Sequence, residues 1–292
     1  MKTLATIGSF AALVLLAAQA SAGPERYSEN LVIGPSQGNH RLDCRIIRPW
    51  PRTSGPEDTR YPVIAWANGW DQGDVVGEFT TLGYRPGLIE WALDGPYIVI
   101  AANQWSARAP DVLQCLQWLV DQDTEPGSLY EGVVDTESIG LAGHSQGGGA
   151  VIKAGDGEPN GFEIAAVVVM NPYGPDWVDA GSQDGPMMLV GGTDDTTTPV
   201  SSFLAVWEAI QANGVGGLLA VLIGGTHNDD AWAPADDFDN PQDYDFGRYQ
   251  RVTELWWQLH LNGNASAGRQ LERELDNDPW ITDYAFTIDF QL

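Results

Sequence analysis

The chain of 292 residues is strongly acidic, with 40 Asp and Glu residues against 14 Lys and Arg and a formal net charge of −26. A surface of this sign repels nucleic-acid phosphates and anionic lipids, so we expect no nucleic-acid partner and no membrane partner. Because salt screens repulsion between like charges, the same composition is typical of proteins from saline environments, and halophilic behaviour is a further hypothesis.

The first 22 residues have the pattern of an export signal. A basic start at Lys2 is followed by an apolar run over residues 4–18 and by an Ala-x-Ala cleavage site at residues 20–22. The apolar run is short for a membrane span. We therefore expect a secreted or periplasmic protein without a membrane span. Residues 23–292 are then expected to form one domain, and the protein to be a monomer.

The chain has two cysteines, Cys44 and Cys115. Cys44 falls in an early apolar segment and Cys115 on the apolar face of an expected helix. A disulfide would persist in an oxidising compartment, but two buried free thiols fit the sequence equally well. The sequence leaves both alternatives open.

From residue 61 onward, apolar runs of strand length alternate with amphipathic segments. Strands are predicted at residues 62–67, 97–102, 138–142, 164–170, 186–190 and 218–223. Helices are predicted at residues 85–93, 110–121, 202–212 and 249–261. Two weaker strands, around residues 31–33 and 42–47, are expected to form an antiparallel edge. Continuous apolar strands that alternate with helices predict an α/β protein with a doubly wound, mostly parallel sheet and helices on both faces.

The strongest chemical signal is the pentapeptide Gly-His-Ser-Gln-Gly at residues 143–147. It follows the strand predicted at residues 138–142 and leads into a segment of small residues, 147–150. A serine in such a G-x-S-x-G turn between a strand and a helix is held in a strained backbone conformation, and the flanking glycines let neighbouring backbone approach it. Ser145 is therefore the candidate nucleophile.

A serine hydroxyl needs a general base, and the chain has four histidines. His227 follows the strand predicted at residues 218–223, so its side chain reaches the carboxyl edge of the sheet. His40 precedes the main strands, and His260 falls within a predicted helix. His144 lies inside the pentapeptide, where its side chain is expected to point away from the serine. By position and elimination, His227 is the candidate base.

The acid should follow a strand between the serine and the histidine. Two aspartates, Asp194 and Asp195, follow the strand predicted at residues 186–190. The spacing before Pro199 favours Asp195, which leaves Asp194 as a solvated turn residue or as a partner behind the acid. Nucleophile, acid and histidine then follow one another in the chain order of α/β-hydrolases, not of chymotrypsin or subtilisin.

An acyl-transfer site also needs two N–H donors for the oxyanion. The backbone N–H of Gln146, which follows the nucleophile, is one candidate. The backbone N–H of Trp70, in the turn after the strand predicted at residues 62–67, is the other.

These residues resemble the bacterial cutinase and PET-hydrolase group of α/β-hydrolases, and less closely the dienelactone-hydrolase relatives. Besides the pentapeptide, the likeness rests on residues 95–97 (Gly-Pro-Tyr), 195–200 (Asp-Thr-Thr-Thr-Pro-Val) and 225–227 (Gly-Thr-His). The resemblance spans about residues 60 to 230. It supports Asp195 as the acid, and it implies that the ring of Trp70 lines the cleft.

The resemblance also implies substrate-binding residues. Tyr173 stands where the group has a Trp that stacks on the acyl group, and we include His144, beside the nucleophile, among the substrate-binding residues. Gln146 replaces the Met that is usual after the serine in polyesterases, which makes the floor of the cleft more polar.

The expected protein is thus a secreted serine esterase that forms an acyl-enzyme and is cutinase- or polyesterase-like. Its substrate would be an ester, either a small molecule or a polyester. Alternatives on the same triad are a sugar-acetyl esterase, of acetylxylan or feruloyl type, and an amidase. An alternative of another class is a catalytically silent binding protein. No cofactor is expected, and no metal, because the acidic segment 228–246 is better interpreted as a solvated loop than as a Ca²⁺ site.

Overall fold

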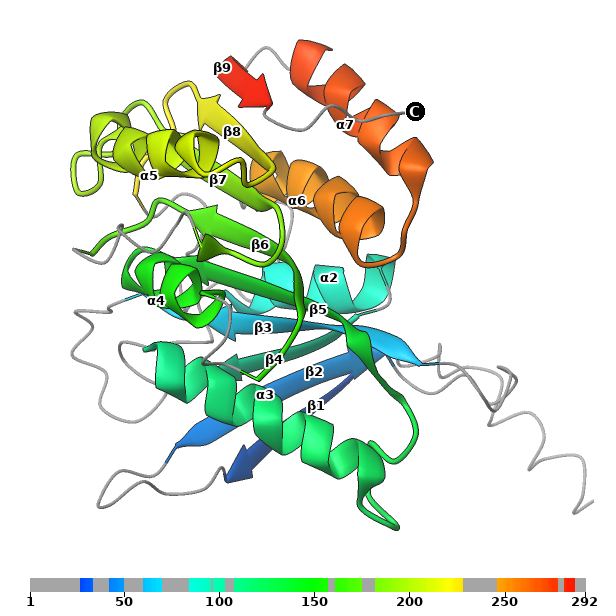
Figure 1. Cartoon of the computed structure of the whole chain (residues 1–292). Helices are drawn as coiled ribbons and strands as arrows, with labels where there is room; N and C mark the ends of the chain where they lie inside the picture. Colours follow the sequence, from blue (N-terminus) through cyan, green and yellow to red (C-terminus); the bar gives the residue numbers. More distant parts are fainter. Residues whose placement is uncertain are drawn as a thin grey trace, which may run out of the picture.

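The computed structural model describes residues 27–33, 42–49, 60–69, 84–95, 97–102, 108–156, 161–174, 182–227, 246–277 and 281–286. In these ranges the strands form one sheet in the order β1-β2-β4-β3-β5-β6-β7-β8-β9 (Figure 1). No helix in the same ranges is both long and apolar enough to cross a membrane.

Most of the sheet is parallel. Its strands are β1 (Tyr27–Ile33), β2 (Asp43–Pro49), β3 (Tyr61–Ala67), β4 (Ile98–Ala102), β5 (Val134–His144), β6 (Ile164–Met170), β7 (Met187–Gly192), β8 (Gly217–Leu222) and β9 (Ile281–Phe286). Strands β3 to β8 pair in parallel. Strands β1 and β2 form an antiparallel edge, as predicted, and β9 pairs antiparallel with β8 at the other edge.

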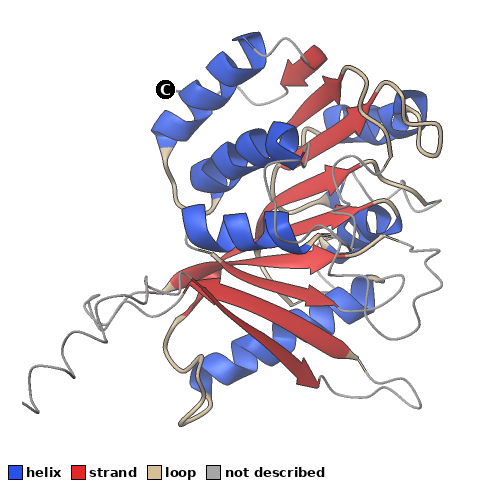
Figure 2. Cartoon of the chain, turned by 180° about the vertical axis from the view of Figure 1, so that it is seen from behind, coloured by secondary structure: helices blue, strands red, loops and turns tan. Residues whose placement is uncertain are grey.

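Helices cover both faces of the sheet, which confirms the α/β class predicted from the sequence (Figures 1 and 2). The helices are α2 (Arg85–Asp94), α3 (Ala109–Thr124), α4 (Gln146–Ala154), α5 (Val200–Ala212), α6 (Phe246–His260) and α7 (Ala265–Asn277). Helices α3, α4 and α5 pack on one face of the sheet, and α2, α6 and α7 pack on the other.

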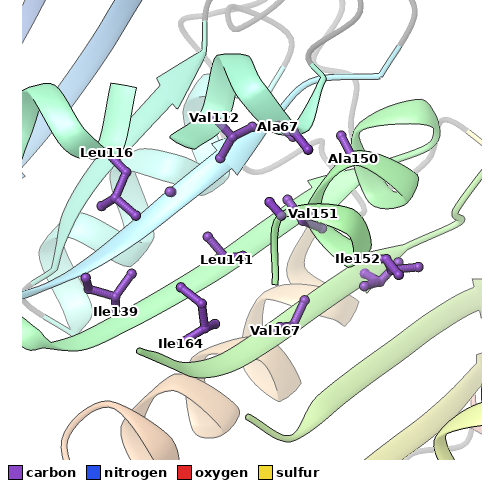
Figure 3. Close-up of a cluster of buried hydrophobic side chains, with 14 of the residues drawn as sticks. Ala67, Val112, Leu116, Ile139, Leu141, Ala150, Val151, Ile152, Ile164 and Val167 are labelled. Carbon is purple, nitrogen blue, oxygen red and sulfur yellow. The ribbon is translucent and has the colours of Figure 1, made fainter. Parts of the chain in front are cut away.

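Successive strand residues alternate between two hydrophobic cores. In β3, Val63 and Ala65 face the core under α3 and α4, whereas Ile64 and Trp66 face the core under α2 and α6. Figure 3 shows the first core, in which Leu141 of β5 and Val167 of β6 lie against the helices. Because both faces are covered, the parallel strands are buried along most of their length, except near the start of β5, and this burial produced the continuous apolar runs seen in the sequence.

A disulfide joins Cys44 of β2 to Cys115 of α3, which decides between the two alternatives left open by the sequence. The two residues are 71 positions apart in the chain, and their Cα atoms lie 5.8 Å apart. Both cysteines are buried in the core between the sheet and α3. The bridge therefore fastens β2, the second strand of the sheet, to the helix that covers it.

Two C-terminal elements, α7 and β9, were absent from the sequence prediction. Helix α7 buries Ala267, Leu271 and Leu275, whose spacing of four residues is a helical signal that could have predicted it. Strand β9 is six residues long and contains Thr282 and Asp283, so it lacks the apolar run of a central strand. Its place in the sheet depends on pairing with β8 rather than on its own sequence pattern.

Candidate active site

The nucleophile candidate lies on a sharp turn between β5 and α4. Ser145 has φ 54° and ψ −123°, in a region that residues with side chains rarely adopt. A Cβ on Gly143 would collide with the backbone of Gly147, and a Cβ on Gly147 would collide with the carbonyl of Ala67. The two glycines of the pentapeptide are therefore required by close backbone contacts, as the sequence predicted.

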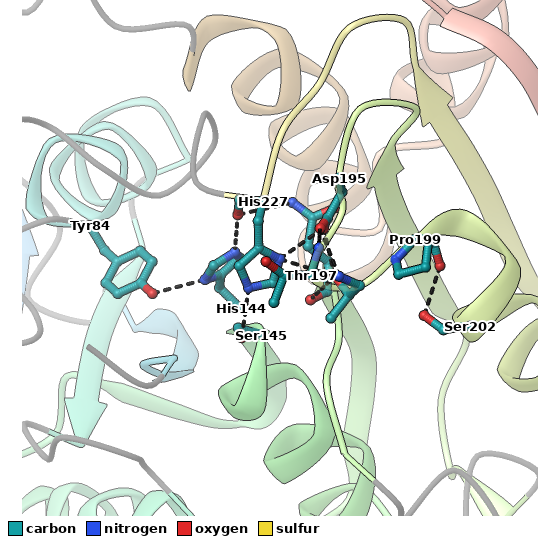
Figure 4. A network of polar contacts seen from close by, with 10 residues as sticks. Tyr84, His144, Ser145, Asp195, Thr197, Pro199, Ser202 and His227 are labelled. Carbon is teal, nitrogen blue, oxygen red and sulfur yellow. Dashed lines mark hydrogen bonds and ion pairs between the residues drawn. The ribbon is translucent and has the colours of Figure 1, made fainter. Parts of the chain in front are cut away.

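Ser145, His227 and Asp195 form a chain of hydrogen bonds (Figure 4). Oγ of Ser145 lies 2.9 Å from Nε2 of His227, and Nδ1 of His227 lies 2.8 Å from Oδ2 of Asp195. A carboxylate accepts hydrogen bonds, so the ring proton is at Nδ1 and Nε2 is free to accept the serine proton. Three residues that come from separate turns at the carboxyl edge of the sheet are thus brought into one geometry suited to nucleophilic catalysis.

The acid is held by its own turn. Oδ1 of Asp195 accepts hydrogen bonds from the N–H groups of Thr197, at 2.8 Å, and Thr198, at 2.7 Å. Burial raises the pKa of Asp195, but hydrogen bonds from the Thr198 hydroxyl, the Thr198 N–H and His227 lower it by more, so the pKa lies below its usual range. Asp194 is exposed and accepts a hydrogen bond from the Thr193 hydroxyl instead, so Asp195 is the aspartate that reaches the histidine.

Two glycines bring the loops of the acid and the base into contact. A Cβ on Gly192, at the end of β7, would collide with the carbonyl of Gly225, two residues before His227. The N–H of Asp194 also donates to the carbonyl of Gly225 at 3.0 Å. The separation between Asp195 and His227 therefore depends on backbone packing that only glycine allows at residue 192.

One oxyanion donor predicted from the sequence lies at the start of a helix. Gln146 is the first residue of α4, so its N–H belongs to the positive end of the helix dipole, beside the nucleophile. The second predicted donor, Trp70, lies outside the described residues. Gly69 precedes it, and a Cβ on Gly69 would lie 2.9 Å from Cβ of Ser145, so the turn after β3 passes directly beside the nucleophile.

Tyr173 is anchored to the nucleophile by its backbone. Its N–H donates to the carbonyl of Ser145 at 2.8 Å, and its side chain is 50% exposed. The carbonyl of Tyr173 would lie 2.8 Å from a Cβ on Gly149 of α4, so the small residue at that position allows the close approach. The backbone of Tyr173 thus lies beside the nucleophile, and the residue is half exposed.

The structure does not support His144 as a substrate-binding residue. Its side chain is 1% exposed, and both ring nitrogens contact protein groups, namely the hydroxyl of Tyr84 and the main-chain carbonyl of His227. The alternation of side chains along β5 explains this position, because His144 lies on the same face as Ala142, toward α2. The prediction that His144 binds substrate therefore has no support in its burial or in its hydrogen-bond partners.

Two residues near the site were not identified from the sequence. Thr198 contacts both Asp195 and His227 through its hydroxyl. An aspartate favours a turn in which its side chain accepts from the backbone two residues further on, and this signal could have indicated the turn that contains Thr198. Tyr84 contacts His144 from a distant part of the chain, and no local pattern marks it.

No group of three or more His, Cys, Asp or Glu side chains that could hold a metal ion occurs within the described ranges. The acidic segment considered for Ca²⁺ lies outside them, apart from its last residue, Phe246.

A serine on a strand-to-helix turn at the carboxyl edge of a mostly parallel sheet, followed in the chain by an acid and then a histidine, defines the α/β-hydrolase fold. The chain has this fold. Residues 97–219 match a protein family described as PET hydrolase-like. The matched range contains Ser145, Tyr173 and Asp195 and ends before His227.

A curated relative is a bis(hydroxyethyl) terephthalate hydrolase from Streptomyces coelicolor. It is 28% identical over 102 residues, which make up 34% of this chain and 29% of the relative. The aligned part is thus less than a third of that relative's length. Together, the family match and this relative confirm the resemblance to the PET-hydrolase and cutinase-like group of α/β-hydrolases that the sequence predicted.

Proposed function

We propose that this chain is a serine esterase that cleaves carboxylic esters through an acyl-enzyme. The observation that carries the proposal is the hydrogen-bond chain from Oγ of Ser145, through the ring of His227, to Oδ2 of Asp195. The strained conformation of Ser145 adds support, because such a conformation persists only where surrounding structure enforces it, and it is common at functional sites.

In this mechanism, Nε2 of His227 takes the hydroxyl proton of Ser145 while Oγ forms a bond to the ester carbonyl carbon. The carbonyl oxygen becomes an oxyanion, which the N–H groups of Gln146 and Trp70 stabilise. His227 then gives its proton to the alkoxide as the bond to the alcohol breaks. Water repeats both steps, with His227 as base and then as acid, and releases the carboxylic acid and Ser145. Asp195 holds the proton at Nδ1 and stabilises the imidazolium.

The proposed substrate is an ester with an aromatic or apolar acyl group. The resemblance to PET hydrolase-like proteins and to a bis(hydroxyethyl) terephthalate hydrolase supports an aromatic ester. The half-exposed Tyr173, whose backbone is bonded to Ser145, supports stacking of its ring on the acyl group. We propose that Trp70 lines the same cleft. Sugar-acetyl esters and amides are the alternatives that the substrate profile tests.

The proposed enzyme is exported, with residues 1–22 as its signal peptide and residues 23–292 as a single domain. The disulfide between Cys44 and Cys115 supports this assignment, because such bridges form and persist mainly in oxidising compartments. N-terminal sequencing of the protein recovered from culture medium and periplasm would test both the cleavage and the location. A mature protein that starts at Met1 and stays inside the cell would contradict the assignment.

The first test is the initial rate on p-nitrophenyl esters from acetate to palmitate and on bis(hydroxyethyl) terephthalate. Wild type is compared with Ser145→Ala and with Ser266→Ala, which removes an exposed hydroxyl of α7 as a matched control. We expect turnover by wild type and Ser266→Ala and none above background by Ser145→Ala. Turnover of acetate alone would favour a sugar-acetyl esterase, and turnover of longer or aromatic acyl groups would favour a cutinase-like cleft.

The second test separates an enzyme from a binding protein. A fluorophosphonate probe should label folded wild type at Ser145, as located by mass spectrometry, and should not label Ser145→Ala. A folded protein that neither reacts with the probe nor cleaves any ester would contradict the proposal and favour the silent binding protein. Cleavage of p-nitroanilides in preference to esters would favour the amidase.

A further inference from the structure

A second chain of hydrogen bonds leads to the base from the opposite side of the site (Figure 4). The N–H of Gly69 donates to the hydroxyl of Tyr84 at 3.2 Å, and that hydroxyl lies 2.9 Å from Nδ1 of His144. Nε2 of His144 lies 2.7 Å from the main-chain carbonyl oxygen of His227. The chain thus joins the turn after β3, the end of β5 and the loop that carries the base.

The partners determine which ring nitrogen of His144 carries the proton. A carbonyl oxygen only accepts, so Nε2 of His144 must donate to His227. In a neutral ring Nδ1 is then the acceptor, and the Tyr84 hydroxyl donates to it while accepting from Gly69. Burial, followed by the nearby His227, lowers the pKa of His144 to about 3, so the ring is neutral near neutral pH.

Packing holds this pair in one orientation. The ring of Tyr84 lies 4.9 Å from that of Trp66 and 5.6 Å from that of His144, and the ring of His144 lies 4.9 Å from that of His227, all measured between centroids. Trp66, Tyr84 and His144 are buried. The amide of Asn171 approaches the same carbonyl of His227 at 3.4 Å, a much longer contact than that of His144. His144 is therefore the closer donor to the main chain of the base.

We propose that Tyr84 and His144 form a positioning pair for the base. The Tyr84 hydroxyl holds His144 in the tautomer that donates from Nε2, and this donor holds the main chain of His227 at the distance its ring needs to reach Ser145. The pair also ties that main chain to Gly69, next to the turn that carries the second oxyanion donor. The inference rests on the proposed function, because a base is positioned only if Ser145 is the nucleophile.

Two substitutions of His144 separate the two hydrogen bonds. In His144→Gln, the amide nitrogen can take the place of Nε2 and donate to His227. In His144→Asn, the amide oxygen can take the place of Nδ1 and accept from Tyr84, but the shorter side chain does not reach His227. Tyr84→Phe removes only the hydroxyl. Tyr97→Phe is the matched control, because it removes a buried tyrosine hydroxyl that contacts Asn262 instead of the site.

We expect His144→Asn to lower kcat by about tenfold to a hundredfold with little change in KM, because a small displacement of a catalytic group slows the chemical step. His144→Gln should recover most of that loss, and Tyr84→Phe should lower kcat by about threefold to tenfold. Labelling by the fluorophosphonate probe should slow in the same order. Equal losses in His144→Gln and His144→Asn, or losses confined to KM, would overturn the proposal.

Histidine labelled with ¹⁵N supplies a readout that does not need activity. The spectrum of wild type should show His144 protonated at Nε2 and not at Nδ1, and Tyr84→Phe should shift the Nδ1 resonance while Tyr97→Phe leaves it in place. If His144 is protonated at Nδ1, the proposal is overturned even where His144→Asn fails to fold. If wild type cleaves no ester but the spectrum is as expected, the proposed function fails while the hydrogen-bond pair remains.

Discussion

The hydroxyl of Thr198 lies 2.6 Å from Oδ2 of Asp195, the same oxygen that receives the hydrogen bond from His227. The hydroxyl oxygen is also 3.0 Å from Nδ1 of His227. The hydroxyl of this buried threonine therefore contacts both partners of the hydrogen bond between Asp195 and His227. The N–H of Thr198 donates to the other carboxylate oxygen at 2.7 Å. This contact accounts for part of the lowered pKa of Asp195.

Thr198→Val should weaken the site without changing its shape. The valine keeps the volume but removes a hydroxyl bonded to a carboxylate, so the pKa of Asp195 should rise and kcat/KM should fall by about threefold to thirtyfold. Because a protonated acid cannot support the base, the acidic limb of the pH profile should move to higher pH. Thr198→Ser, which keeps the hydroxyl, is the control. Equal pH profiles for the valine variant and wild type would contradict the role of the hydroxyl.

The two neighbouring aspartates offer a matched pair of substitutions. In Asp195→Asn the amide no longer stabilises the imidazolium of His227 and disfavours the required tautomer, so kcat should fall by a factor on the order of 10³ to 10⁴. Asp194→Asn alters an exposed side chain of the same turn and should keep activity within about twofold of wild type. The measurement is kcat on one p-nitrophenyl ester. A larger loss in the residue 194 variant would assign the acid to Asp194.

Removal of the disulfide should destabilise the fold and spare the chemistry. The bridge closes a loop of 71 residues, for which the loop-entropy relation gives a stabilisation of about 4 kcal/mol. Cys44→Ala combined with Cys115→Ala should therefore lower the midpoint of urea unfolding, and reductant should have no further effect on this variant. Activity in the folded range should remain, because both cysteines lie in the core away from the site. An unchanged midpoint would contradict the stabilising role.

Two histidines, the buried His144 and the partly buried His260, should make the protein less stable in acid. The pKa of His144 is lowered from 6.5 to about 3 by burial and by His227, and that of His260 from 6.5 to about 4 by burial. The unfolded chain binds these protons more readily than the folded chain. The contribution of the two neutral histidines to the free energy of unfolding is therefore fully present above pH 6.5 and is lost as the pH falls toward the folded-state pKa values. Urea midpoints measured across this range should decline accordingly.

His260 provides a test of this pH dependence away from the site. His260→Phe keeps a ring against Trp256, whose centroid is 4.2 Å away, and removes a buried Nε2 that has no hydrogen-bond partner among the residues that the structure describes. The difference in free energy of unfolding between the variant and wild type should be about 1–2 kcal/mol more favourable to the variant near pH 5 than near pH 8. Activity near pH 8 should be unchanged. A gain that is the same at both pH values would show that protonation of His260 plays no part.

Salt should stabilise the folded protein and should not inhibit its activity. A net charge of −26 produces repulsion within the folded chain, and molar NaCl shortens the range of that repulsion to about 3 Å. We expect ester hydrolysis to persist or rise in molar NaCl and the unfolding temperature to rise with it. Circular dichroism at each salt concentration separates folding from inhibition. Loss of activity by a protein that stays folded would contradict the halophile hypothesis.

Local patterns in the sequence were sufficient for most of the fold and for the nucleophile. The runs that became β3 to β8 are mostly apolar because most residues of these strands are buried, on one face of the sheet or the other. The turn at Ser145 is equally local, since its backbone conformation needs small residues two positions away on either side. Constraints of this kind act on neighbouring residues, so a short stretch of sequence is enough to predict them.

The remaining features depend on single contacts between distant residues. The pairing of Cys44 with Cys115, the contact between Tyr84 and His144, and the antiparallel addition of β9 each join segments that have no common pattern. The orientation of His144 shows the same limit, because the strand and the helix packed on it decide which face a side chain occupies. Sequence determined the local backbone and the residue types of the site, and tertiary packing decided which partner each side chain meets.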